Sequence, residues 1–81
     1  MSYDGFVGSI AISKNGHDKG DCYVITGIVD DRFAFVANGQ NRRLEAPKRK
    51  NILHLSVTKS RTAATNDLGI RNAIEEFKKR R

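Results

Sequence analysis

The sequence has no tryptophan, one cysteine and one proline, and these scarcities exclude several classes of protein. A single cysteine cannot form an internal disulfide, and one cysteine with two histidines cannot supply a four-ligand zinc site. No apolar run approaches the roughly 20 residues of a membrane-spanning helix. The first residues have neither the basic start nor the apolar stretch of a secretory signal. We therefore expect a protein of the reducing cytoplasm with no metal, no cofactor and no membrane partner.

The chain also lacks a grouping of residues typical of an active site. With 81 residues it should form one domain, whose small interior offers little room for a catalytic pocket. The GxxxxGK[ST] pattern of nucleotide hydrolases is absent. The acidic residues of the first half fall in expected turns, where aspartate is common: Asp18, Asp21, Asp30 and Asp31. We expect no catalytic residues and no enzymatic activity.

Charge is abundant and unevenly distributed. Residues 1–31 hold two Lys and five Asp, a net charge of −3, whereas residues 32–81 hold thirteen Lys or Arg against four acids, a net charge of +9. A basic half on a small domain is typical of proteins that bind a polyanion such as a nucleic acid.

Short segments rich in β-branched and aromatic residues predict a mainly β fold. Asn38-Gly39 is a strong signal for a two-residue hairpin turn of type I′. Phe33 and Phe35 share one face of their strand, and we expect both in the core. Cys22 opens a strand and is expected to be a small buried side chain. Strands so closely spaced favour a closed β-barrel, with expected strands within 6–12 and at 22–29, 33–37, 40–44 and 53–58.

The last third of the chain predicts a helix. Asn66 or Asp67 can cap a helix that runs to about Lys79, after a polar linker over 59–65. An isolated helix of this length is marginal, so its apolar stripe must pack on the barrel or on a partner. That stripe contains Ile70, Ala73, Ile74 and Phe77. We assign residues 1–60 to the barrel and 61–81 to the linker and helix, which together form one domain.

Two basic segments are candidate RNA-binding sites. Five cations lie within nine residues around Pro47, although such a run can also be a solvated face or a nuclear import signal. The 14–20 loop combines cations with glycines that permit close backbone approach, although it can also be a plain turn. Tyr23, Phe33 and Phe35 are less favoured candidates for base stacking. The residues predicted to bind RNA are Lys14, Asn15, His17, Lys19, Arg42, Arg43, Lys48, Arg49, Lys50, Asn51, His54, Lys59 and Arg61.

Several of these segments resemble a known family. The stretch 8–20, which ends in Asp-Lys-Gly and precedes Tyr-Val-Ile, resembles the KOW motif of ribosomal and transcription-elongation proteins. Segment 46–55, APKRKNILHL, is similar to the eukaryote- and archaeon-type large-subunit ribosomal protein fourteen and to short bacterial KOW-domain RNA-binding proteins akin to it. The resemblance covers about residues 5–77. It implies an SH3-like β-barrel, RNA binding and a link to the ribosome.

These observations lead to one expected function and one alternative. We expect a monomeric, non-catalytic protein that binds structured RNA, ribosomal RNA foremost, with ribosomal proteins as further partners. The alternative is an SH3-like protein-interaction module of the translation or transcription machinery. In that case the basic loop would bind an acidic protein surface, and the apolar stripe of the helix would be the interface.

Overall fold

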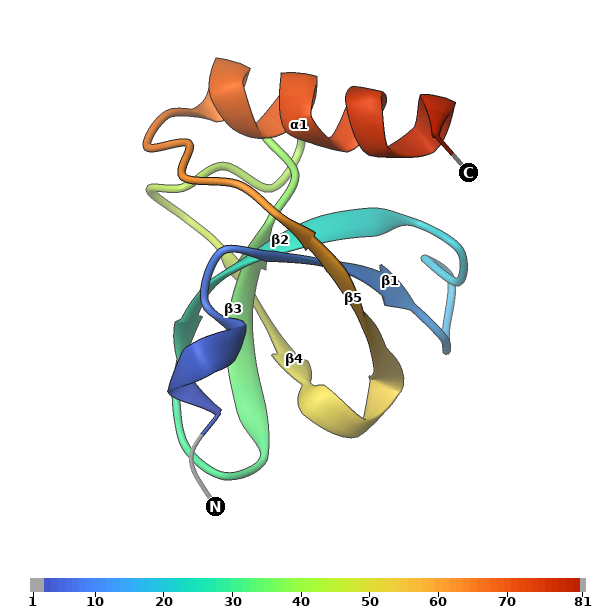
Figure 1. The fold of residues 1–81 in the computed structure, drawn as a ribbon. Helices are drawn as coiled ribbons and strands as arrows, with labels where there is room; N and C mark the ends of the chain where they lie inside the picture. Colours follow the sequence, from blue (N-terminus) through green and yellow to red (C-terminus); the bar gives the residue numbers. More distant parts are fainter. Residues whose placement is uncertain (1–2, 81) are drawn as a thin grey trace.

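The computed structural model describes residues 3–80, which form one five-stranded antiparallel sheet and a C-terminal helix (Figure 1). The expected mainly β fold with a terminal helix is therefore confirmed, while Met1, Ser2 and Arg81 of the predicted segments lie outside the described residues. The strand order is β4-β3-β2-β1-β5. The elements are η1 (Asp4–Phe6), β1 (Ser9–Ser13), β2 (Cys22–Ile28), β3 (Phe33–Ala37), β4 (Lys48–Asn51), η2 (Ile52–His54), β5 (Leu55–Arg61) and α1 (Asp67–Lys79).

The sheet is curled but open, so the closed barrel expected from the sequence is not formed. Strands β4 and β5 are its two edges, which four strand spacings would hold roughly 19 Å apart in a flat sheet. The chain crosses between them through the three residues of η2, and a 3₁₀ turn rises only about 2 Å per residue. The sheet must therefore curl until its edges approach at η2 (Figure 1). Because η2 turns the chain there, β5 pairs with β1 instead of β4.

Each face of the curled sheet carries an apolar core, because successive strand residues point to opposite faces. The core inside the curl contains Ala11, Tyr23, Ile25, Ala34, Val36, Ile52 and Leu55. The outer core lies between the sheet and α1 and contains Ile10, Cys22, Val24, Ala37, Ile70 and Ile74. The expected burial of Cys22 as a small apolar side chain is confirmed.

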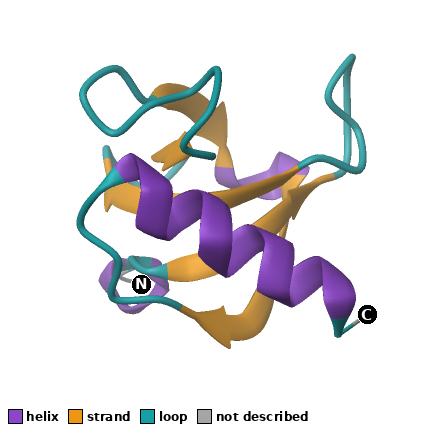
Figure 2. Cartoon of the chain, turned by 90° about the horizontal axis from the view of Figure 1, so that it is seen from above, coloured by secondary structure: helices purple, strands orange, loops and turns teal. Residues whose placement is uncertain are grey.

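Helix α1 begins at the predicted cap and lies across the outer face of the sheet (Figure 2). The side-chain Oδ1 of Asn66 accepts a hydrogen bond of 2.7 Å from the backbone N–H of Gly69. Ile70 and Ile74 of the predicted stripe are buried, and Phe77 packs beside them. The helix thus buries its apolar stripe on its own sheet, which settles a question that the sequence left open.

The predicted hairpin at Asn38-Gly39 is wrong. A type I′ turn needs positive φ at both central residues, and among the described residues only glycines have positive φ. Instead, the side-chain oxygen of Asn38 accepts hydrogen bonds from the backbone N–H groups of Gln40 and Arg42, at 2.9 and 3.0 Å. These bonds hold a loop where the return strand 40–44 was expected. The strand that pairs with β3 is β4, several residues later.

The prediction that Phe33 and Phe35 lie in the core is also wrong. Their neighbours Ala34 and Val36 face the inside of the curl and are fully buried. Phe35 is 38% exposed and Phe33 is half-buried, both on the other face. Alternation in a strand shows which residues share a face, but it does not show which face is buried.

Candidate nucleic-acid interface

A hollow of about 490 Å³ lies between the β1–β2 loop, the loop that follows β3, strand β4 and η2. The backbone N–H of Lys14 donates to the carbonyl of His54 at 2.8 Å, which fixes the β1–β2 loop against η2. The two basic segments singled out in the sequence are therefore brought together here. The hollow is lined by Asn15, Gly16, His17, Asp18, Asp21, Tyr23, Asn41, Arg42, Lys48, Lys50 and His54.

The floor of this hollow is an ion-pair cluster centred on Asp18. The Nζ of Lys50 lies 3.1 Å from the carboxylate and that of Lys48 lies 3.2 Å from it. The hydroxyls of Tyr23 and Ser13 each donate to the same carboxylate at 2.9 Å. Lys50 is only 9% exposed. The cluster therefore ties the β1–β2 loop to β4 across the fold.

Two pKa values are shifted in this cluster. Burial alone would raise the pKa of Asp18, but hydrogen bonds from Lys50, Tyr23, Ser13 and Lys48 outweigh it and hold that pKa well below its usual range. Burial raises the pKa of Tyr23 well above its usual range, and the hydrogen bond to the Asp18 carboxylate adds to the rise. Asp18 is thus ionised and Tyr23 is neutral at physiological pH. Two ammonium groups face one carboxylate, so the floor keeps a net positive charge.

Exposed cationic and imidazole side chains surround the floor. Of the lining residues, His17 comes from the β1–β2 loop, Arg42 from the loop after β3, and His54 from η2. Lys14 and Lys19 belong to the same loop as His17 but do not line the hollow. All five are exposed. This arrangement presents hydrogen-bond donors from three separate segments around one hollow. Such an arrangement suits phosphate groups, because each phosphate accepts several charge-assisted hydrogen bonds.

Strand alternation separates the basic run of β4 into two groups. Lys48 and Lys50 point into the hollow and pair with Asp18, whereas Arg49 points to the outer face. There its guanidinium lies 4.7 Å from the centre of the Phe33 ring. The run was predicted to act as one RNA-binding loop, but its side chains lie on two different surfaces of the protein.

The remaining predicted residues lie away from the hollow. The side chain of Asn51 accepts a hydrogen bond from the N–H of Leu53 and caps η2. Arg61 donates to the carbonyls of Gly5 and Val7 and to the hydroxyl of Ser9, so intramolecular hydrogen bonds hold its guanidinium. Arg43 and Lys59 are exposed and do not line the hollow.

Sequence reasoning missed the role of Asp18, which it assigned to a turn, and of Tyr23, which it weighed as a base-stacking residue. The lysine partners of Asp18 are 30 and 32 residues away in the chain, so no local pattern indicates the ion pairs. One signal was present. Lys48 and Lys50 are two residues apart, and in a strand that spacing places both on one face.

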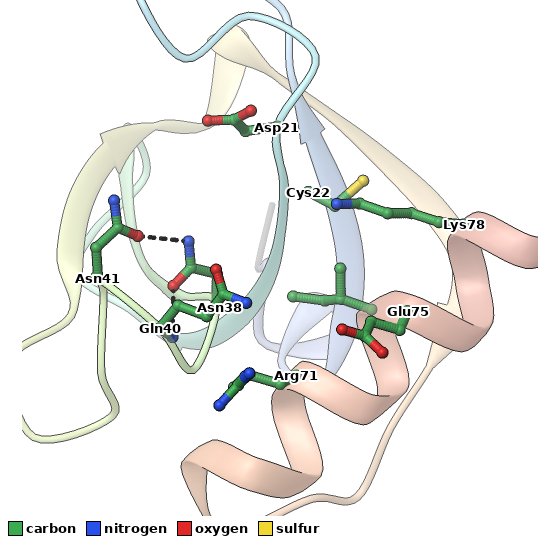
Figure 3. Close-up of a pocket in the computed structure, with 9 residues that line it drawn as sticks. Asp21, Cys22, Asn38, Gln40, Asn41, Arg71, Glu75 and Lys78 are labelled. Carbon is green, nitrogen blue, oxygen red and sulfur yellow. Dashed lines mark hydrogen bonds between the residues drawn. The ribbon is translucent and has the colours of Figure 1, made fainter.

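A second, smaller cavity of about 210 Å³ lies between α1, the start of β2 and the loop after β3 (Figure 3). Its lining is polar, and in that lining Asn38 Nδ2 donates to Asn41 Oδ1 at 2.8 Å. Figure 3 also shows Arg71, Glu75 and Lys78 of α1 around this cavity. Over residues 3–80, no three or more His, Cys, Asp or Glu side chains gather in a way that could hold a metal ion. Within that range no helix is long and apolar enough to cross a membrane.

Comparison of the chain with protein-family models finds no match, and comparison with curated protein sequences finds none either.

Proposed function

We propose that this chain is a non-catalytic RNA-binding protein that binds structured RNA, ribosomal RNA foremost, at the basic hollow. The observation that carries the proposal is the convergence of His17, Arg42 and His54, from three separate segments, on one concave surface. The carboxylate at its floor, Asp18, is already paired with two lysines. It therefore does little to repel an incoming phosphate.

The loop between β1 and β2 supports this use of the hollow. Gly16 and Gly20 both have positive φ, and a Cβ at Gly20 would meet no other atom within 4 Å. The backbone there is open on its outer side, so the phosphate–sugar chain of an RNA helix can approach it closely. Recognition of this kind reads the shape and the backbone of RNA more than its base sequence.

We further propose that the curled sheet belongs to the SH3-like, KOW-type architecture. The antiparallel strand order, the short 3₁₀ link between the edge strands and the Asp18-Lys19-Gly20 turn support this assignment. Ribosomal RNA and neighbouring ribosomal proteins are the partners that the KOW resemblance favours. The alternative, a protein-interaction module, loses one of its two supports because Ile70 and Ile74 are buried in the chain's own core.

The salt dependence of RNA affinity tests the proposal. Replacing Arg42 with Gln should flatten the slope of log K against log salt by about one unit, because each cation that contacts a phosphate contributes about one. The measurement is fluorescence anisotropy with a labelled ribosomal RNA hairpin between about 50 and about 200 mM salt. Glutamine is neutral and of similar length, and Arg42 is exposed in a loop, so the sheet is left intact.

The matched control removes the same charge elsewhere. Lys59→Gln removes one exposed cation that does not line the hollow, and its salt slope should stay near that of the wild type. Equal slopes for the two variants would contradict the assignment of the hollow. Binding of an acidic protein at the hollow, with no measurable RNA affinity, would favour the interaction-module alternative.

A further inference from the structure

An aromatic and cationic surface lies on the outer face of β3 and β4, outside the basic hollow. Phe33 and Phe35 are two residues apart and share this face. Arg49 lies opposite Phe35 in the β3–β4 ladder, and its guanidinium covers the ring of Phe33. We call Phe33, Phe35 and Arg49 the outer platform.

Helix α1 leaves the outer platform uncovered. The helix packs on Ile10, Val24 and Ala37, whereas β3 begins at the end of the sheet that lies far from α1 in Figure 1. Phe35 is exposed, which is unusual for a phenylalanine in the middle of a strand.

Local packing explains part of the position of Phe35. Its partner across the β2–β3 ladder is Gly27, and a Cβ added there would lie 3.8 Å from the Phe35 ring. The ring thus lies over a glycine, an arrangement that shields the backbone of a strand. Shielding uses one side of the ring and leaves the other side open to solvent. Covering Gly27 needs only apolar bulk, so an aliphatic side chain would serve that purpose as well.

The chemistry of the outer platform matches a nucleotide. An exposed aromatic ring offers a stacking surface to any base, and an arginine held nearby offers two parallel donors to a phosphate. Stacking on Phe33 restricts the Arg49 guanidinium, and Arg49 is the strand partner of Phe35, so less conformational freedom is lost when a phosphate binds. No carboxylate pairs with Arg49 among the ion pairs of the described residues.

We propose that Phe35 stacks on an unpaired base of single-stranded RNA and that Arg49 binds the adjoining phosphate. This inference rests on the proposed function and adds a second class of contact to it. Strand β4 separates the two surfaces, with Lys48 and Lys50 toward the hollow and Arg49 toward the outer platform. Because β4 is an edge strand, an RNA chain can pass from one surface to the other without crossing another strand.

A pair of oligomers tests the stacking contact directly. Eight-nucleotide oligouridine carries bases and phosphates, whereas an abasic ribose-phosphate oligomer of the same length carries phosphates alone. Phe35→Leu keeps apolar cover over Gly27 but removes the ring, and it should weaken oligouridine binding by about five- to 150-fold. Its affinity for the abasic oligomer should not change. Arg49→Gln should instead weaken the binding of both oligomers, because it removes a phosphate contact.

A second variant tests the same contact independently, in case Phe35→Leu does not fold. The natural chain has no Trp, so Phe35→Trp introduces a single indole at the outer platform. Oligouridine should quench its fluorescence and the abasic oligomer should not. Leu68→Trp places an exposed indole on α1 as the control, and neither oligomer should quench it.

The outcomes separate this inference from the proposed function. If Phe35→Leu binds oligouridine as the wild type does, the stacking contact is absent. Binding of hairpin RNA at the hollow is tested separately, by whether Arg42→Gln flattens the salt slope of hairpin binding. Failure of the wild type to bind either RNA overturns both proposals. Self-association that Phe35→Leu abolishes, without an effect on oligouridine, would assign the outer platform to a second copy and overturn the stacking proposal.

Discussion

Replacing Asp18 with Asn should lower the free energy of unfolding by about 3–5 kcal/mol near neutral pH, because removing one partner of a buried ion pair leaves the other charge uncompensated. Lys50 is almost fully buried and would be left without its carboxylate partner. Lys48 reaches solvent, so most of the loss comes from Lys50. Urea denaturation followed by far-UV circular dichroism measures the difference.

The effect of Asp18→Asn should depend on pH in a defined direction. The pKa of Asp18 lies well below its usual range in the folded protein, so its contribution is fully present above the unfolded-state pKa of about 4. That contribution is lost as the pH falls from there toward the lower native pKa. The gap in stability between wild type and Asp18→Asn should therefore be widest near pH 7 and narrow below about pH 4.

Two further variants distinguish the ion pair from general effects of charge. Asp21→Asn removes an exposed carboxylate of the same loop and should change stability by less than about 0.5 kcal/mol. Adding Lys50→Met to Asp18→Asn should restore much of the stability, since the buried charge is replaced by an apolar side chain of similar length. A double variant as unstable as the single one would show that Lys50 is not the source of the loss.

The second large effect is expected at Gly39. Its φ of +78° disfavours any residue with a Cβ, and a Cβ there would also collide with the carbonyl oxygen of Asp67 and the side chain of Arg71. The side chain of Asp67 accepts a hydrogen bond from the N–H of Leu44 at 2.8 Å. This bond and the packing of Gly39 both hold the loop after β3 against the start of α1. Gly39→Ala should lower the free energy of unfolding by roughly 2–5 kcal/mol, from backbone strain and overpacking together.

Gly20→Ala is the matched control for Gly39→Ala. Gly20 also has positive φ, but a Cβ there meets nothing within 4 Å. Its cost should be the backbone strain alone, about 1–2 kcal/mol. Thermal and urea unfolding of both variants separates the two contributions. Equal losses for the two variants would contradict the tight packing of Gly39 against α1.

Local signals in the sequence predicted the elements whose stabilising contacts are local. Strand β3 has the bounds that its aromatic and β-branched run indicates, and α1 begins at the Asn66 cap because that cap bonds to a residue three positions later. The prediction of a return strand at 40–44 was wrong because the contacts that set this segment are not local. The loop that replaces it is set by the Asn38 side chain and by the fit of Gly39 against α1, a contact between distant segments.

The candidate site was predictable as a set of segments but not as an arrangement. The charge pattern indicated the 14–20 loop and the basic run around Pro47, and the structure places both at one hollow. The inward position of Lys48 and Lys50 follows from a strand that begins at Lys48, which the sequence assigned to a loop. The outward position of Phe35 depends on which face of the sheet is filled, and that is decided by packing across the whole fold.

The basic residues of β4 lie at an open edge of the sheet, and this position also affects self-association. An edge strand presents unpaired backbone groups that can template pairing with another copy of the chain. In this protein the edge strand β4 has the sequence Lys-Arg-Lys-Asn, so two copies that meet edge to edge bring like charges together. The cations that surround the proposed RNA surface therefore also act as gatekeepers against β-aggregation, a protection that a closed barrel would not need.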